Sequence, residues 1–359
     1  MDNAHLEVNR SSHATTRVVE EPLRDLAPGQ VRFRVERFAL TANTVTYATV
    51  GDVLGYWDFF PVQGGWGRVP AMGWAEVVAS THDGVAPGRR CFGWFPMSRY
   101  VDMTATPTAD GLRDDGPHRA AHAPVYRAYT ATDRDPFYEP GSDAEDRHAL
   151  LRALFITGFL AEDYLGDCGY FGASHVLVLS ASSKTAIGFA HCADARDGLD
   201  VIGVTSAANH AFAYGVGCYD EVVTYDDIEA IPRMPVVSID MSGNGTVLAR
   251  VHTHFGDQLR HSMAIGRSHH DAPGHPDEIP GPKPAFFFAP TQVKRRVEAW
   301  GAAGYQSRVG HALREFVDAS HAWLGLVRSS GPAAAAATWR AVYDGSVAPN
   351  VGQIVSMWD

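Results

Sequence analysis

The stretch that decides the fold is HVLVLSASSKTAIGFAHCADA, residues 175–195. It begins with a short, almost wholly apolar run, which is typical of a strand buried on both faces of a parallel sheet. Small residues follow over 180–183, and the rest of the stretch has the pattern of a helix. A buried strand, a tight turn and a helix in this order predict the first unit of a doubly wound α/β sheet.

The same alternation of strand and helix continues toward the C-terminus. Further strands are predicted in DVIGVTS (200–206), EVVTY (221–225), PVVSIDM (235–241), SMAIG (262–266) and AFFFAP (285–290). The sequences NHAFAYGVG and VLARVHTHFGDQLR are predicted helices between them. Strands and helices in alternation indicate a doubly wound sheet with helices on both faces.

The residues before this region have a different pattern. Predicted strands are VRFRVERFAL (31–40), WAEVVAS (74–80), CFGWFPM (91–97) and SRYVDMT (98–104), with glycine and proline turns between them. Short strands separated by turns predict a compact β-barrel-like domain rather than a parallel sheet.

Other segments connect and close these two regions. The charged, proline-bearing stretch Thr106–Glu145 is predicted as a linker or excursion, and Ala144–Leu165 as a helix. After the doubly wound region, helices are predicted over 293–320 and 332–345, and a final short strand over 350–358.

Composition and charge limit the classes of function. The chain has 359 residues, 45% hydrophobic and 20% charged, which excludes a disordered, collagen-like or coiled-coil protein. A formal net charge of −11 argues against a nucleic-acid partner. The sequence has neither an apolar run long enough to span a membrane nor the features of a signal peptide. We therefore expect a soluble, cytoplasmic protein with four reduced cysteines.

The turn after the first buried strand is the first candidate binding site. A strand, a turn of small residues and a helix N-terminus bring backbone N–H groups to the point where dinucleotide folds bind a diphosphate. Ser180, Ser183 and Ala186 stand where the usual motif has glycine. The candidate cofactor-binding residues are Ser180, Ser182, Ser183, Lys184 and Thr185, most of which add side-chain phosphate donors. The alternative is a capped helix start without a ligand.

The end of the second buried strand bears on the choice of cofactor. An acidic residue there would accept a hydrogen bond from the adenosine ribose of NAD, and none is present. Thr205, Ser206 and Asn209 can instead donate to the 2′-phosphate of NADP. These residue types are also common helix caps. The sequence therefore favours NADP(H) over NAD.

Motifs along nearly the whole chain occur in a familiar order. VRFRVERFALTANTVTYATVG (31–51) contains a strand and a segment like V-N-x-x-D, and HVLVLSASSKTAIGFA is similar to V-L-V-x-G-A-x-G-G-V-G. Four shorter matches are GVAPGRRCFGW to G-D-R-V, SRYVDM to A-E-Y-V, YDEVVTYDD to A-D-x-V-I-D-Y, and VGQIVSM to G-K-I-V-L. Together they resemble the medium-chain dehydrogenase/reductase superfamily, in particular its zinc-free quinone oxidoreductases. The serine-rich S-S-K-T-A turn resembles a branch described as a domain of unknown function.

The resemblance implies two domains and a zinc-free site. A GroES-like β-barrel catalytic domain would cover residues 1–145 and be completed by residues 310–359, and a Rossmann-type nucleotide-binding domain would cover residues 146–309. Leu40 and Thr41 lie near the position of a zinc-binding cysteine, and MGWAE lacks the zinc-binding histidine. The four-cysteine structural zinc lobe is also missing, so zinc-assisted alcohol oxidation is disfavoured.

The resemblance also implies where the chemistry takes place. A nicotinamide would lie between the two domains and face Thr157, Gly266, Ser268 and Phe288. Tyr47, Tyr56 and His269 are candidate proton donors or oxyanion partners, and each could instead be a packed or surface residue. Asn43 could orient a substrate carbonyl, contact the nicotinamide ribose or cap a helix.

Two further patterns leave alternatives open. Gly55–Pro61 contains four aromatic residues, which could form the wall of an apolar substrate pocket or a hydrophobic staple between the barrel and its partner. Among the 17 histidines, His252 and His254 are two apart on a predicted helix and so point to different faces. The residues near His269 include few oxygen ligands, so we expect no metal site.

These observations predict a zinc-independent NADP(H)-dependent oxidoreductase. It would reduce a small activated carbonyl, enone or quinone, with an apolar or aromatic carbonyl compound as its partner. Two alternatives are non-redox carbonyl chemistry, such as a lyase or isomerase step, and a nucleotide-binding protein without turnover. The resemblance implies a homodimer formed through the edge strand of the nucleotide sheet.

Overall fold

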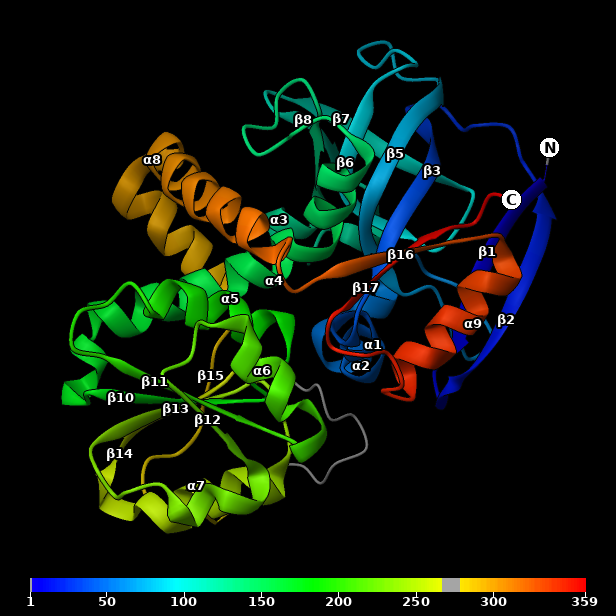
Figure 1. Ribbon diagram of the computed structural model, residues 1–359. Helices are drawn as coiled ribbons and strands as arrows, with labels where there is room; N and C mark the ends of the chain where they lie inside the picture. The colour runs from blue at the N-terminus through cyan, green and yellow to red at the C-terminus, as the bar shows by residue number, and fades with distance from the viewer. Residues whose placement is uncertain (1, 267–277) are drawn as a thin grey trace. The chain divides into compact units, whose positions relative to one another are not determined.

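The computed structural model describes residues 2–266 and 278–359. The chain forms two units, one of Met1–Leu150 with Gly325–Asp359 and one of Leu151–Leu324 (Figure 1). The second boundary lies later than the predicted residue 309 because α8 (Ala289–Ser320), kinked at Gly301, belongs entirely to the second unit.

The first unit contains a closed barrel of six antiparallel strands. In order around the barrel these are β3 (Gln30–Leu40), β5 (Pro70–Ser80), β6 (Arg90–Pro96), β9 (Ala128–Ala131), β8 (Gly111–Asp114) and β7 (Tyr100–Thr108), which pairs again with β3. The C-terminal strand β17 (Val351–Ser356) pairs with β3, and β16 (Gly325–Ser330) pairs with β17. The predicted β-barrel fold is confirmed.

The prediction of a linker over Thr106–Glu145 is wrong for much of that stretch. It contains β8 and β9, which complete the barrel, and the short helix α3 (Pro124–Arg127). These elements have only four residues each, too few to show periodicity. Sequence analysis also assigned no strand to β1 (Asp2–Asn9) or β2 (Ser12–Pro22), which form a separate sheet with β4 (Trp66–Gly67).

The second unit is the predicted doubly wound sheet. Its six parallel strands lie in the order β12 (Glu221–Thr224), β11 (Asp200–Thr205), β10 (His175–Leu179), β13 (Val236–Asp240), β14 (Leu259–Ala264) and β15 (Ala285–Phe286). Helices α5 (Lys184–Ala193) and α7 (Gly245–Phe255) cover opposite faces (Figure 1). Two more helices of this unit are α4 (Ser142–Asp167), which begins in the first unit, and α6 (His210–Val216).

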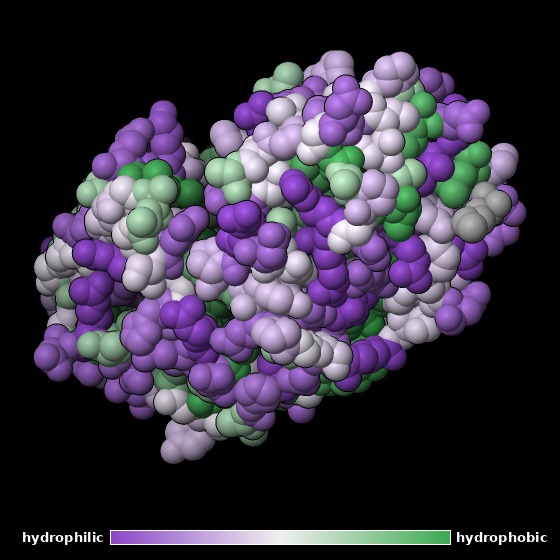
Figure 2. Space-filling model, turned by 90° about the horizontal axis from the view of Figure 1, so that it is seen from above, coloured by the Kyte–Doolittle hydropathy of each residue, from purple (hydrophilic) through white to green (hydrophobic). Residues whose placement is uncertain are grey.

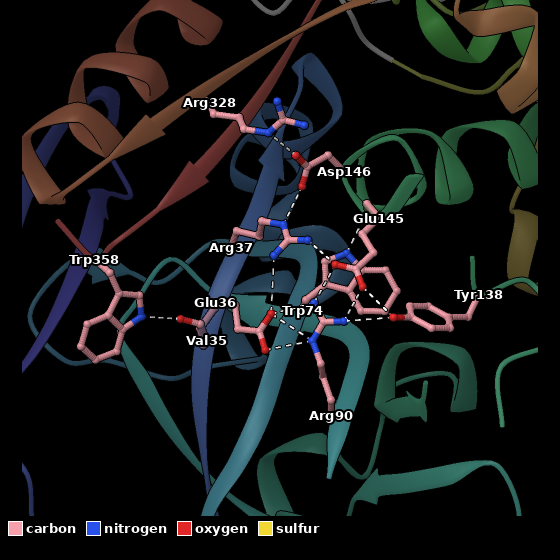
Figure 3. A network of polar contacts seen from close by, with 10 residues as sticks. All are labelled: Val35, Glu36, Arg37, Trp74, Arg90, Tyr138, Glu145, Asp146, Arg328 and Trp358. Atoms are coloured by element: carbon pink, nitrogen blue, oxygen red, sulfur yellow. Dashed lines mark hydrogen bonds and ion pairs between the residues drawn. The ribbon is translucent and has the colours of Figure 1, made fainter. Parts of the chain in front are cut away.

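A network of buried ion pairs fixes the start of α4 to the barrel (Figure 3). Glu145 and Asp146 are its centre, and both are almost completely buried. Arg37 of β3 donates to Asp146 at 2.6 Å and also pairs with Glu145. Glu145 also accepts hydrogen bonds from Arg90 at 2.5 Å and from the Tyr138 hydroxyl at 2.7 Å. Asp146 accepts a further hydrogen bond from Arg328 at 2.6 Å. The network joins β3, β6, β16 and α4 within the first unit.

The charge on Glu145 is stabilised by its partners. Burial alone would raise the pKa of this carboxyl group. Hydrogen bonds from Arg90 and Tyr138, and the charges of Arg90 and Arg37, outweigh burial and lower the pKa to about 2. Because the pKa in the folded protein is depressed, this contribution to stability is present above pH 4.5 and is lost as the pH falls toward 2.

Replacing Glu145 with glutamine tests the network. The substitution removes the carboxylate that Arg37 and Arg90 share, although Arg37 keeps Asp146 and Arg90 keeps Glu36 as partners. Because charged hydrogen bonds are lost, E145Q should lower the free energy of unfolding by about 2 kcal/mol at pH 7, measured with urea. E145Q should also lose less stability than the wild type between pH 4.5 and 2. Glu298→Gln is the control, because the Glu298 side chain is 67% exposed in its pair with Lys294. Equal losses of unfolding free energy in E145Q and E298Q would contradict the role of Glu145 at the centre of the network.

Candidate functional site

The candidate cofactor site lies along one edge of the parallel sheet. The carboxyl ends of β10, β11, β13 and β14 meet there because these strands are parallel and in register. The chain order reverses at β10, whose neighbours β11 and β13 lead to opposite directions of the sheet. In doubly wound folds such a reversal leaves a crevice where ligands bind. The turn Ser180–Ser183 begins at this point.

The turn has the backbone shape of a glycine-containing turn, although it contains no glycine. Ser180 has a φ of +65°, in the left-handed region that glycine adopts at little cost. Its hydroxyl group is hydrogen-bonded to Tyr225. The Ser183 amide donates to the Ser180 carbonyl at 2.8 Å, and the Ser183 side chain caps α5 by accepting from the Ala186 amide. Ser183 is therefore the N-cap of α5, and its part in cofactor binding stays a prediction.

Ser182 connects the turn to the end of the next strand. Its Oγ accepts hydrogen bonds from Thr205 Oγ1 at 3.3 Å and from Asn209 Nδ2 at 3.1 Å. A serine hydroxyl has two acceptor positions and one hydrogen to donate. Because both acceptor positions are filled, the remaining interaction available to Ser182 is to donate its hydrogen. That property suits an anionic ligand.

Lys184 and Thr185 occupy the first turn of α5, where N–H groups have no acceptor within the helix and the helix dipole favours a negative charge. Burial lowers the pKa of Lys184 to about 8. A bound phosphate would favour the charged form of this lysine.

The remaining predicted cofactor residues are spread over several elements. Ser206 begins the turn over 207–209, Gly266 donates its amide to the Asp240 carbonyl at 3.4 Å, and Phe288 precedes α8. Thr157 is on α4 and donates to the Ala153 carbonyl at 2.9 Å. Its neighbour Gly158 packs on α5, where a Cβ would lie 2.8 Å from the Thr185 carbonyl oxygen. Ser268 and His269 lie outside the described residues.

A second candidate site is a cluster of phenol groups in the first unit. Asn43 and Tyr47 are one turn apart on α1 (Ala42–Thr49), and the Asn43 amide donates to the Tyr47 hydroxyl oxygen at 2.5 Å. The Tyr47 ring lies 4.7 Å from that of Tyr56, whose hydroxyl is 3.1 Å from that of Tyr126. We call Asn43, Tyr47, Tyr56 and Tyr126 the phenol cluster. Asn43 does not cap α1, because Thr41 precedes the helix and Thr44 bonds its amide.

Burial dominates the electrostatics of this cluster. Tyr47 and Tyr56 are 9% and 5% exposed, and burial raises the pKa of both phenols. The hydrogen bond from Asn43 opposes this effect at Tyr47. Both phenols therefore keep their protons at neutral pH and can donate hydrogen bonds.

The aromatic stretch Gly55–Pro61 serves mainly as core. Tyr56, Trp57, Phe59 and Phe60 are all buried and belong to the hydrophobic core of the first unit. Packing in the core of the first unit is neither of the two roles expected for this segment, and both of those roles stay predictions. Tyr56 also contributes its hydroxyl group to the phenol cluster.

Sequence analysis missed two residues that contact the candidate sites. Tyr126 lies in the stretch that was predicted as a linker. Apart from its being aromatic, nothing in the sequence around it indicates a site. Tyr225 follows β12 and bonds Ser180. Both contacts join residues far apart in the sequence, so no local pattern could reveal them.

Metal centres and membrane-spanning helices are two other features for which the described residues give an answer. Within residues 2–266 and 278–359, no cluster of three histidine, cysteine or acidic side chains could hold a metal ion. No helix in the same residues is sufficiently long and apolar to cross a lipid bilayer. Figure 2 shows a mostly hydrophilic face with small hydrophobic patches.

Comparison with protein families gives one match. The family model described as "Protein of unknown function (DUF2855)" matches residues 38–348. The chain belongs to this family. A search of curated proteins gives no match.

Solved structures share the fold of this DUF2855 member over its whole length. CurA from Vibrio vulnificus has 12% sequence identity and a TM-score of 0.63, with 99% of this chain and 98% of that chain covered. The yhdH oxidoreductase from Salmonella enterica, in complex with NADP, has 16% identity, a TM-score of 0.55 and 99% coverage of both chains. The quinone oxidoreductase from Coxiella burnetii has 14% identity, a TM-score of 0.52 and 99% coverage of both. The resemblance to the medium-chain dehydrogenase/reductase fold is confirmed.

The backbone of Ser180 gives a test of the turn. Ser180→Ala and Ser180→Gly both remove the hydroxyl group that contacts Tyr225, but only glycine relieves the left-handed conformation. S180G should therefore be more stable than S180A by about 1 kcal/mol, measured by urea denaturation. Equal stability of the two variants would show that the turn does not hold this conformation in solution.

Proposed function

We propose that this protein is an oxidoreductase that uses NADP(H) to reduce a small activated carbonyl compound, enone or quinone. The observation that carries the proposal is Ser182, whose two accepted hydrogen bonds leave its hydrogen to be donated at the point where the sheet reverses. The similar fold of an oxidoreductase in complex with NADP supports the same cofactor class.

The turn fits the diphosphate and 2′-phosphate of NADP(H). The Thr185 amide and the Ser182 hydroxyl would donate to the diphosphate, and Lys184 would supply a positive charge. Ser206 is partly exposed after β11, where an acidic residue would repel a 2′-phosphate and none is present. Thr205 and Asn209 donate to Ser182, so they would act through Ser182 rather than on the phosphate directly.

The phenol cluster would supply the proton. NADPH, when bound, supplies a hydride to the substrate. The Asn43 amide donates to the Tyr47 oxygen, so the hydroxyl hydrogen of Tyr47 is directed elsewhere and can be donated to a substrate oxygen. The aromatic rings that pack on the Tyr47 ring suit an apolar or aromatic carbonyl compound.

Ser182→Ala tests the cofactor half of the proposal. Loss of a donor to a charged oxygen should weaken NADPH binding about tenfold or more, measured by fluorescence titration. Ser174→Ala is the matched control, because Ser174 precedes β10 at the opposite end of the strand and its hydroxyl contacts His175 at 2.9 Å. Absence of NADPH binding in the wild type would instead favour non-redox chemistry.

Tyr47→Phe tests the proton donor. Removing a general acid typically costs a factor of 10² to 10⁴, so Y47F should lower kcat about 100-fold while the affinity for NADPH is unchanged. The assay follows NADPH oxidation with a panel of enones, quinones and activated carbonyl compounds. Wild-type protein that binds NADPH but oxidises it with none of them would favour a nucleotide-binding protein without turnover.

A further inference from the structure

The segment over 117–127 is attached by several contacts to the stretch that carries Tyr56. The His122 ring nitrogen Nε2 is 2.9 Å from the Gly55 carbonyl oxygen, and the His122 ring packs 4.5 Å from that of Phe59. The Tyr126 hydroxyl is 3.1 Å from that of Tyr56. A stretch between two barrel strands thus reaches the residues that carry the proposed chemistry.

Aromatic packing fixes the position of Tyr126. Its ring meets those of Trp94 and Tyr56 edge to face, with centroids 5.4 and 5.7 Å apart. A third ring, that of Phe59, lies 5.5 Å away. Edge-to-face pairs at these distances are favourable and directional. The Tyr126 hydroxyl is therefore held against Tyr56 by its own ring and does not depend on the single hydrogen bond.

Each of the two inner phenols of the cluster has one polar partner. The Asn43 amide donates to the Tyr47 oxygen, and the Tyr126 and Tyr56 hydroxyls are 3.1 Å apart, where either group can be the donor. Tyr56 is 5% exposed, whereas Tyr126 is half-buried and closer to the solvent. A hydroxyl group can accept and donate at once, so Tyr126 can both hold Tyr56 and exchange its own proton with water.

We infer that Tyr126 is a positioning residue that makes Tyr56 a second proton donor of the site. The inference rests on the proposed function. In the reduction, NADPH when bound would supply a hydride with its electron pair, and a phenol of the cluster would supply one proton. The O–H bond of Tyr56 breaks as the O–H bond of the product forms. The Tyr56 oxygen then takes a proton from Tyr126, which regains one from water.

Single and double phenylalanine variants test whether Tyr126 acts through Tyr56. Y126F keeps the ring packing and should lower kcat about tenfold, with the KM for NADPH unchanged. Y56F should lower kcat by at least as much, and Y56F/Y126F should lose no more than Y56F alone, because the partner of Tyr126 is already absent. Tyr129→Phe is the matched control, since Tyr129 lies three residues after Tyr126, on β9, and its hydroxyl donates to the Trp94 carbonyl at 2.8 Å.

A second measurement detects the hydrogen bond between Tyr56 and Tyr126 without following turnover. In protein labelled with ¹³C at tyrosine Cζ, the Tyr56 signal should shift in Y126F and stay in place in Y129F. Additive losses in the double variant, or Y126F with wild-type kcat beside an impaired Y56F, would overturn the role of Tyr126 and leave the proposed function intact. Wild-type protein with no NADPH oxidation would overturn the proposed function and this inference together.

Discussion

The reversal of strand order at β10 is the constraint on which the candidate cofactor site depends. Right-handed connections take the chain from β10 to β11 on one side and bring it back at β13 on the other. The helices that follow β10 and β13 therefore cover opposite faces, and the turn after β10 lies at the carboxyl edge of the sheet. Parallel register then places Thr205 beside Ser182 across 23 residues of sequence.

In the first unit, closure of the barrel positions the residues of the candidate site. The pairing of β6 with β9 brings the residues before β9 toward those that end β6. Tyr126 lies two residues before β9, and Trp94 lies near the end of β6. Their edge-to-face contact follows from this pairing, and it places a hydroxyl group beside Tyr56. The ion pairs of Glu145 and Asp146 hold β3, β6 and α4 together around the same barrel (Figure 3).

Much of the fold could be predicted from the sequence because its strongest elements have local patterns. The strand over His175–Leu179 is wholly apolar, and the turn after it is made of small residues, so both were assigned without tertiary information. The barrel strands β8 and β9 are four residues long in a polar stretch, so only their pairing partners define them. In β1, six consecutive buried residues include polar ones, because β2 and other neighbours cover them.

In the candidate sites too, residues in local patterns could be predicted and contacts between distant residues could not. Ser182, Lys184 and Tyr47 were identified because each stands in a recognisable segment, but their partners were not assigned. Thr205 and Asn209 were expected to face a phosphate, and the structure instead bonds them to Ser182. Hydrogen bonds between distant residues depend on strand register and on closure of the barrel. Neither can be predicted from a local sequence pattern.

A crystal structure of the protein grown with NADP⁺ tests the central claim most directly. The account predicts that the diphosphate lies within hydrogen-bond distance of the Ser182 hydroxyl and the Thr185 amide, with Ser180 still in its left-handed conformation. A turn whose amides and hydroxyls are all bonded within the chain, with the dinucleotide elsewhere or absent, would contradict it.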